Sequence, residues 1–188
     1  MKRIAVFASG SGSNAENIAK YFAGNDNVDI TLIVSNKKDA FVHERAKNLG
    51  VESVTFSKSD FEGTDNVLNY LKMKNIDFIV LAGFLLKVPE NLIEAFPYRI
   101  INIHPALLPK YGGKGMYGDN VHKAVIANGE KESGITIHYV NENYDEGAII
   151  FQARCAILPS DTYEDVAKKV HALEYTHFPE VISKLLAD

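Results

Sequence analysis

The chain has 188 residues, of which 46% are hydrophobic and 23% are charged, a composition typical of a folded domain with a full core. This composition excludes a disordered chain, a collagen-like fibre and a disulfide-rich miniprotein. Lysine and arginine number 20 against 24 acidic residues, so the net charge is −4 and gives no indication of nucleic acid as the main partner.

Short apolar runs alternate with helical patterns in the first half of the chain. The runs predict buried strands over 4–8, 30–34, 51–56, 78–82 and 99–103. Apolar side chains at helical spacing predict helices over 15–22, 40–49 and 60–74. Gly50 would stop the second helix, and Asp60 would cap the third. This alternation predicts an α/β fold, a single Rossmann-like domain with a mainly parallel twisted sheet flanked by helices.

The second half of the chain has a different pattern. Four glycines between 110 and 118 predict a mobile loop. One interpretation is that this loop acts as a lid that becomes ordered when a ligand binds. A helix is expected over 119–128. The next two runs, 134–140 and 148–157, predict a half-buried strand and its antiparallel partner, because the link between them is short. A last helix is expected from 162 to about 186, kinked or divided at Pro179.

The single cysteine, Cys155, cannot form an internal disulfide, so we expect a reducing, cytoplasmic compartment. No segment reaches the ~18 consecutive apolar residues of a membrane helix, and the apolar start is too short for a secretion signal. We therefore expect one domain over residues 1–188, in the cytoplasm and without a membrane partner.

The segment from Ser9 to Asn14 joins the first strand to the first helix and contains two glycines. Glycines let a ligand approach the backbone, and a helix N-terminus favours an anion. The segment also fits the relaxed dinucleotide pattern Gly-x-Gly-x-x-Ala. The acidic residue that should follow the second strand is absent, since that strand ends in Val34-Ser35-Asn36. The residues favour a phosphate monoester, with a dinucleotide or a purely structural turn as alternatives.

Asn102 and His104 stand two residues apart at the end of a predicted strand, so their side chains should emerge on one side. Open parallel sheets place their sites at this end of the strands. His104 can exchange protons near neutral pH, and the Asn102 amide can stabilise a developing oxyanion. On spacing alone, a surface histidine before a proline turn explains these residues equally well.

Asp145-Glu146-Gly147 forms a polar turn between the last two strands, and such a turn is most often only structural. The functional interpretation is that Asp145 accepts a hydrogen bond from His104, orients the imidazole and favours its charged form. The remaining histidines lack metal-ligand spacing, so no metal site is predicted. His138 is expected to be a buried strand histidine, with lining of the site as the second interpretation.

Six segments together resemble one enzyme family: 8–14, 34–37, 81–84, 102–109, 134–140 and 145–147. The most specific segment is Asn-x-His-Pro-x-Leu-Leu-Pro at 102–109, together with the downstream Asp145. The Ser-Gly-x-Gly-Ser-Asn sequence at 9–14 then narrows the choice to one enzyme among related ones. The chain resembles the phosphoribosylglycinamide formyltransferases over essentially its whole length. The resemblance implies formyl transfer from 10-formyltetrahydrofolate, as cosubstrate, to the amine of 5′-phosphoribosylglycinamide in purine (IMP) biosynthesis.

The resemblance also implies roles for single residues. Gly12, Ser13 and Asn14 would bind the substrate's 5′-phosphate, and Glu174 would bind the ribose hydroxyls. The implied catalytic residues are Asn102 and His104, which stabilise the oxyanion, and Asp145, which keeps His104 charged. The implied folate-binding residues are Thr64, Leu85, Leu86, Lys87, Val88, Asn102, Asn141, Glu142, Asn143, Tyr144 and Asp145. Thr64 and Leu86 replace arginines of some family members at the folate tail.

Alternatives with the same three catalytic residues are a formyltetrahydrofolate hydrolase and a methionyl-tRNA formyltransferase. Each carries an additional domain, which a chain of this length is not expected to hold. A dinucleotide-dependent dehydrogenase is disfavoured by the missing acidic residue after the second strand. A noncatalytic domain would leave Asn102, His104 and Asp145 idle. The oligomeric state does not follow from the sequence.

Overall fold

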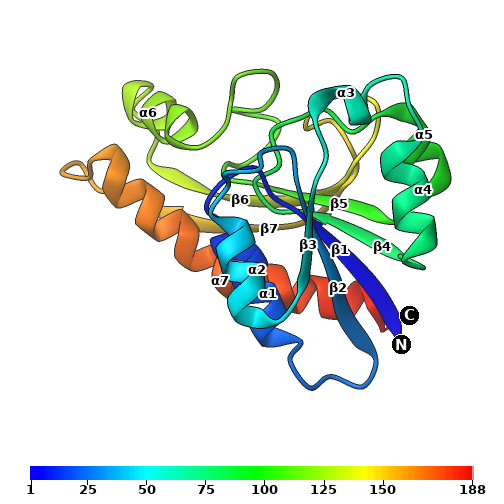
Figure 1. The fold of residues 1–188 in the computed structure, drawn as a ribbon. Coiled ribbons are helices and arrows are strands. Elements are labelled where there is room, and N and C mark those ends of the chain that lie inside the picture. Colours follow the sequence, from blue (N-terminus) through cyan, green and yellow to red (C-terminus); the bar gives the residue numbers. More distant parts are fainter. Residues whose placement is uncertain (188) are drawn as a thin grey trace. The chain divides into compact units, whose positions relative to one another are not determined.

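The computed structural model describes residues 1–187 and has the predicted α/β fold (Figure 1). The chain divides into two compact units, Met1–Asn102 and Ile103–Asp188. Strand β5 (Ile100–His104) runs through the boundary between them. None of the helices in the described residues is both long enough and apolar enough to span a membrane.

The first unit contains parallel strands in the order β3-β2-β1-β4, followed by the first residues of β5. Their bounds are β1 (Lys2–Phe7), β2 (Val28–Ser35), β3 (Glu52–Thr55) and β4 (Phe78–Leu81), followed by β5. The four residues from Ile4 to Phe7 are completely buried, as both faces of a parallel sheet in an α/β fold should be. The five predicted strands of this half are therefore confirmed.

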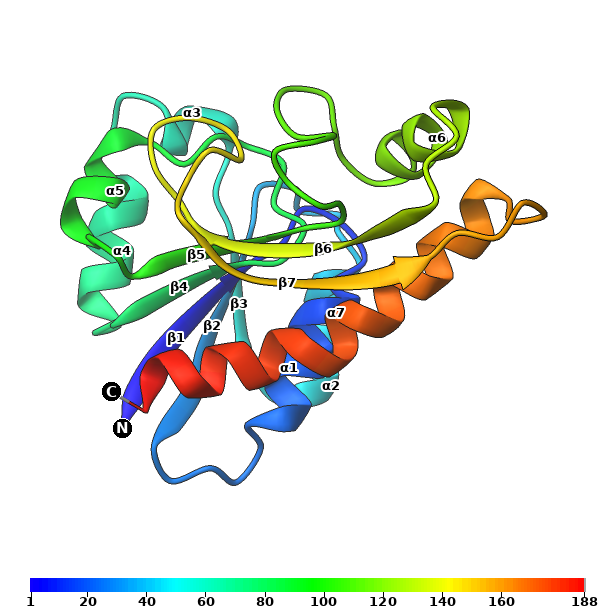
Figure 2. The same ribbon diagram turned by 180° about the vertical axis from the view of Figure 1, so that it is seen from behind.

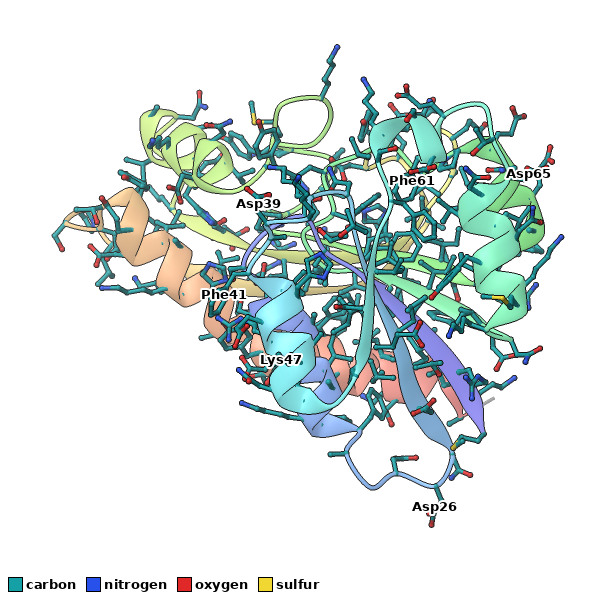
Figure 3. The ribbon with its side chains drawn as sticks, in the orientation of Figure 1. Asp26, Asp39, Phe41, Lys47, Phe61 and Asp65 are labelled. Carbon is teal, nitrogen blue, oxygen red and sulfur yellow. The ribbon has the colours of Figure 1, made fainter. Side chains whose placement is uncertain are left out.

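The helices of the first unit are α1 (Ser13–Tyr21), α2 (Val42–Leu49), α3 (Lys58–Phe61), α4 (Asn66–Met73) and α5 (Glu90–Ala95). Helices α1 and α2 pack together, and α4 packs with α3 and α5. The ring of Phe61 lies in an edge contact with Phe7, at 6.1 Å between centroids, and anchors α3 to the core. Figure 3 shows Phe61 inside the unit, whereas the exposed Asp26 and Asp65 project from its surface.

The single helix predicted over 60–74 is wrong, because two helices, α3 and α4, occupy this stretch. Ser57, not Asp60, caps α3: the Ser57 hydroxyl accepts from the Asp60 amide, and the Asp60 carboxylate accepts from the Ser57 amide at 2.8 Å. Gly63, at φ 72°, then breaks the helical path. The short α5 was not predicted; it starts directly after Pro89.

In the second unit, β6 (Glu132–Tyr139) pairs antiparallel with β7 (Ile149–Ala156), which confirms the predicted pair. The unit also contains α6 (Asp119–Ala127) and α7 (Tyr163–Leu186). Helix α7 packs against β6, β7 and α6, and Figure 2 shows it running along the two strands. A capping box between Thr162 and Asp165 fixes the start of this helix.

One expectation for this unit is wrong, and one of the two alternatives for Pro179 is excluded. Strand β6 is not half-buried: Thr136 is 0% and His138 2% exposed, so its polar face is as buried as its apolar one. The segment that follows β5 covers that polar face, where the Thr136 hydroxyl bonds its backbone. Pro179 does not divide the last helix, since α7 continues through it with the neighbouring Phe178 and Ile182 fully buried.

Candidate active site

The predicted phosphate-binding residues lie at the start of α1, in the first unit. Gly12 precedes the helix at φ 74°, and a Cβ added there would lie 2.2 Å from Cγ2 of Val42. Only glycine fits both the conformation and the close approach of α2. Ser13 and Asn14 form the first turn of α1, where the helix dipole favours an anion. The local geometry therefore suits the predicted phosphate.

Distant residues hold this loop in place. The Arg45 side chain donates from Nε to the Ser11 carbonyl at 2.7 Å and pairs with Glu16. The buried Ser9 hydroxyl donates to Asn36 Oδ1 at 2.6 Å and accepts from the Leu85 amide at 2.9 Å. Ser9 thus joins the loops that follow β1, β2 and β4.

The predicted folate-binding residues of the first unit differ in exposure. Leu85 is 41% exposed, Leu86 is half-buried and Lys87 is exposed, whereas Val88 is buried with 5% exposure. The exposed Thr64 donates to the Asp60 carbonyl at 2.7 Å, a contact that joins α3 to the next turn. These contacts give Thr64 a structural role, and its binding role stays a prediction.

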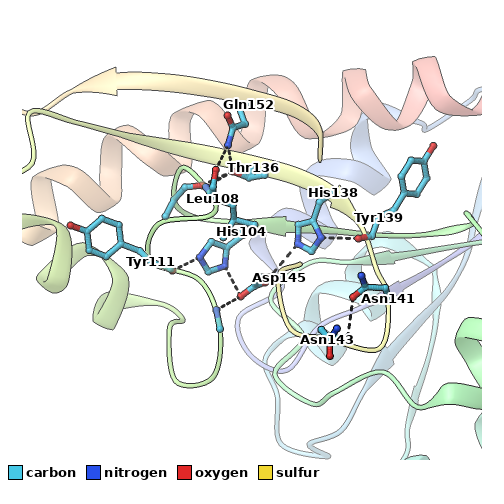
Figure 4. Close-up of polar contacts among 12 residues, drawn as sticks. His104, Leu108, Tyr111, Thr136, His138, Tyr139, Asn141, Asn143, Asp145 and Gln152 are labelled. Carbon is cyan, nitrogen blue, oxygen red and sulfur yellow. Dashed lines mark hydrogen bonds and ion pairs between the residues drawn. The ribbon is translucent and has the colours of Figure 1, made fainter. Parts of the chain in front are cut away.

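The centre of the second unit is His104, the last residue of β5, which is 4% exposed. Its Nε2 donates to the Tyr111 carbonyl at 2.7 Å, and its Nδ1 lies 3.6 Å from Asp145 Oδ2 (Figure 4). The fold thus brings His104 and Asp145 together, at an ion-pair distance rather than in the expected hydrogen bond. Asn102 stands two residues earlier on the same strand, so its side chain leaves β5 on the same side.

Asp145 has two further partners that the sequence analysis did not assign to it. The Gly113 amide donates to Asp145 Oδ2 at 2.9 Å, and Nε2 of His138 lies 3.6 Å from Oδ1. His138 in turn donates from Nδ1 to the Tyr139 carbonyl at 2.8 Å. The expectation that His138 is a buried strand histidine is confirmed, and its approach to Asp145 supports the second interpretation, that it lines the site, as well.

Burial disfavours the charged form of both groups at this centre. It lowers the pKa of His104 below its ordinary value, although Asp145 and the Tyr111 carbonyl both favour the charged ring. Burial acts to raise the pKa of Asp145, but His138, His104 and the Gly113 amide outweigh it, and the net pKa lies below the ordinary value. Asp145 thus acts on His104 in the expected direction, toward the charged ring, while burial acts against it; the catalytic role of the pair stays a prediction.

Both residues that contact His104 have an unusual backbone. Tyr111 has φ 58° and Asp145 has φ 56°, and they are two of four non-glycine residues with positive φ among the described residues. Such conformations are costly and tend to persist where function requires them. The strain is consistent with a functional centre at His104.

Glu174, the predicted ribose-binding acid, lies in α7 and is 4% exposed. Its carboxylate accepts from Nδ1 of His171 at 2.9 Å, and this hydrogen bond raises the pKa of His171. His122 of α6 is buried nearby, and burial lowers its pKa, with His171 and Glu174 acting on it in opposite directions. A buried carboxylate among histidines is a suitable acceptor for hydroxyl groups.

The remaining predicted folate-binding residues form the turn that leads to Asp145. Asn141 accepts the Asn143 amide on its side-chain oxygen at 2.9 Å, which tightens the turn. Glu142, Asn143 and Tyr144 are exposed, with Tyr144 at 42%. Their binding role stays a prediction.

Known proteins are similar to this chain over nearly its full length. The family model described as "Formyl transferase" matches residues 2–182. A chloroplastic phosphoribosylglycinamide formyltransferase of Arabidopsis thaliana is 43% identical over 98% of this chain, which spans 65% of that relative's length. The phosphoribosylglycinamide formyltransferase of Haemophilus influenzae is 37% identical, with 97% of this chain and 86% of the relative covered.

A solved structure gives the same result. The phosphoribosylglycinamide formyltransferase of Anaplasma phagocytophilum superposes with a TM-score of 0.91 and 32% identity, covering 100% of this chain and 87% of that one. The family match includes β5, with Asn102 and His104, as well as the turn that carries Asp145. From sequence and fold alike, the chain belongs to the formyl transferase family, among the phosphoribosylglycinamide formyltransferases.

Proposed function

We propose that this chain transfers a formyl group from 10-formyltetrahydrofolate to the amine of 5′-phosphoribosylglycinamide, a step of purine biosynthesis. The observation that carries the proposal is the buried His104, 3.6 Å from the Asp145 carboxylate, at the end of the strand that also holds Asn102. Proton exchange at a buried imidazole and an amide donor for an oxyanion are what an acyl transfer to an amine requires.

The chemistry assigns one task to each catalytic residue. The substrate amine attacks the formyl carbon, its nitrogen becomes positive and the carbonyl oxygen becomes an oxyanion. The Asn102 amide stabilises that oxyanion. His104 takes the proton from the attacking nitrogen and returns it to the folate nitrogen as the old carbon–nitrogen bond breaks. The products are a formamide and tetrahydrofolate, and no proton is gained or lost overall.

The lowered pKa of His104 fits this sequence of events. A ring that favours neutrality can accept a proton at pH 7, and Nδ1 is the nitrogen without the proton when Nε2 donates to Tyr111. While the oxyanion exists, it adds its negative charge to that of Asp145 and stabilises the charged ring. Asp145 thus acts during the reaction rather than before it.

The binding roles follow the same proposal. Gly12, Ser13 and Asn14 at the start of α1 bind the 5′-phosphate, and the buried Glu174 accepts the ribose hydroxyls. The turns at 85–88 and 141–145 bind the folate, together with Thr64. We also propose that residues 1–188 work as one formyltransferase domain, since the family match runs through both units. The free thiol of Cys155 supports a reducing, cytoplasmic location.

The test is a steady-state assay with the purified full chain, both substrates and a parallel reaction without the nucleotide. The expected result is loss of formyl-folate that depends on the nucleotide and yields the formylated product. Loss without the nucleotide would assign hydrolysis instead. No loss from a folded protein would overturn the substrate assignment.

A further inference from the structure

The Tyr111 carbonyl decides which nitrogen of His104 carries the proton. A carbonyl only accepts hydrogen bonds, so at 2.7 Å from Nε2 it requires a proton on that nitrogen. Asp145 is also only an acceptor and favours a proton on Nδ1, but it lies farther away, at 3.6 Å, so in the neutral ring the closer carbonyl keeps the proton on Nε2. Because the carbonyl belongs to the main chain, its position depends on whatever holds the segment from 105 to 111.

Two side chains hold that segment from β6 and β7. The Thr136 hydroxyl donates to the Ala106 carbonyl at 2.7 Å and accepts from the Leu108 amide at 3.0 Å. Nε2 of Gln152 donates to the Leu108 carbonyl at 3.0 Å and to the Thr136 hydroxyl at 2.9 Å (Figure 4). The Thr136 hydroxyl thus uses its one donor and both of its acceptor positions. Leu108 is held through both its amide and its carbonyl.

The strand register makes this arrangement rigid. Thr136 and Gln152 are direct cross-strand partners in the antiparallel pair, so both side chains stand on one face. Thr136 is 0% exposed, where a hydrogen bond is stronger and an unpaired group more costly than in water. At the far end of the segment, the Tyr111 hydroxyl donates to Glu130 at 2.9 Å, which ties the same residue to the turn after α6.

We propose that Thr136 and Gln152 are positioning residues that hold the Tyr111 carbonyl on His104 and so select the ring tautomer with its proton on Nε2. Neither touches the reacting atoms in this proposal. The effect on rate rests on the proposed function, because the selected tautomer leaves Nδ1 free to accept the proton. The effect on the ring itself does not rest on it.

The other charged and titratable groups around His104 are not altered by a substitution at Thr136 or Gln152. They are Asp145 from the 145–147 turn, His138 from β6, Glu174 from α7 and His122 from α6. A change in the His104 tautomer in Thr136→Val or Gln152→Leu is therefore attributed to a displaced Tyr111 carbonyl.

The test compares Thr136→Val and Gln152→Leu with Thr136→Ser, which keeps the hydroxyl, and with Arg154→Ala. Arg154 is the matched control, because it lies on the same strand and the same face as Gln152, is exposed and pairs only with Glu132 in the contacts described. Ring ¹⁵N shifts of His104 are measured in the labelled, ligand-free full chain and assigned by their loss in His104→Asn. Steady-state kcat and KM are measured on the same samples.

The expected result is an Nε2-protonated ring in the unmodified chain, in Thr136→Ser and in Arg154→Ala. In Thr136→Val and Gln152→Leu we expect a mixture of tautomers and a loss in kcat of about tenfold, with KM nearly unchanged, as for other residues that orient a functional histidine. Gln152 is only half-buried, so its variant keeps the test valid if Thr136→Val fails to fold.

Unchanged ¹⁵N shifts in the folded Gln152→Leu variant would overturn the proposal. A loss of kcat with an unchanged tautomer would also overturn it, because the role would then be structural only. If the tautomer shifts in these variants but the unmodified chain shows no formyl transfer, the positioning role of Thr136 and Gln152 would be supported and the proposed function would be overturned instead.

Discussion

The two units hold their predicted site residues by different means. In the first unit the loop at Gly12 is fixed by packing against Val42, by the hydrogen bonds of Ser9 and by Arg45, which also pairs with Glu16. In the second unit His104 is held by the Tyr111 carbonyl and by the partly buried Asp145 carboxylate. The first arrangement depends mainly on close packing around a glycine, and the second on the protonation of a buried histidine. Substitutions should therefore affect nucleotide binding through geometry and turnover through charge.

The largest effect should come from removing the negative charge of Asp145 beside His104. Asp145→Asn keeps the size of the side chain and tolerates the positive φ, but it removes the charge that stabilises protonated His104. We expect kcat to fall about 10²–10³-fold with little change in KM, measured by steady-state formyl transfer. Glu146→Gln is the control, since it removes a neighbouring exposed charge. An equal loss in both variants would contradict the comparison.

The loop at Gly12 should be disrupted by a steric clash. Gly12→Ala places a Cβ 2.2 Å from Val42 at a residue with φ 74°. The strain costs about 1–2 kcal/mol before the clash is added, so we expect a lower free energy of unfolding and a raised KM for the nucleotide. Gly24→Ala has the same φ and no atom within 4 Å, which isolates the backbone cost in urea unfolding. Equal destabilisation of the two variants would show that the Val42 contact is unimportant.

Acid should destabilise the second unit through its buried histidines. The pKa values of His104 and His122 lie below the ordinary value of about 6.5 because of burial. Below that pH the unfolded chain binds protons that the folded chain resists, so the free energy of unfolding falls as pH decreases. Each histidine contributes at most about 1.4 kcal/mol per pH unit. His171, whose pKa is raised by Glu174, contributes in the opposite direction.

Urea unfolding at pH 7.5, 6.5 and 5.5 checks this prediction. The free energy of unfolding of His122→Asn should depend less on pH than that of the unmodified chain, with the difference confined to the acid side. Identical pH dependence in both proteins would show that His122 titrates normally in the folded state.

The smallest effect should separate a bonded buried serine from an unbonded one. Ser9 and Ser133 are both 2% exposed, but the Ser133 hydroxyl has no hydrogen-bond partner among the described residues. Ser9→Ala should cost about 1 kcal/mol and raise KM a few fold, because it leaves the Leu85 amide unpaired. Ser133→Ala should be neutral or stabilising in thermal unfolding. The reverse order would contradict the hydrogen bonding described for these two serines.

The strands could be predicted because a parallel sheet buried on both faces requires continuous apolar runs. The break at Gly63 could not, since Asp60 suits both a cap and the third position of a capping box. Local patterns also predicted a half-buried β6. Its polar face is buried by the segment at 106–108, a contact between residues about 30 apart that no local period reveals.

The site shows the same limit. Spacing placed Asn102 and His104 on one side of a strand, but it could not connect them with Asp145, which lies about 40 residues later. The family resemblance supplied that connection. His138 was only a second interpretation, because its approach to Asp145 depends on the path of the following turn. The protonation of His104 depends on burial, which spacing does not determine.

The positive φ of Asp145 restricts the mutational paths open to this position. Only glycine, asparagine and aspartate enter that backbone region readily, and aspartate alone among them carries a charge. Glutamate, the nearest chemical substitute, would meet the steric cost of the backbone before its longer side chain could act. In a saturation library at position 145 we therefore expect some substitutions to preserve the fold, but none to preserve full turnover.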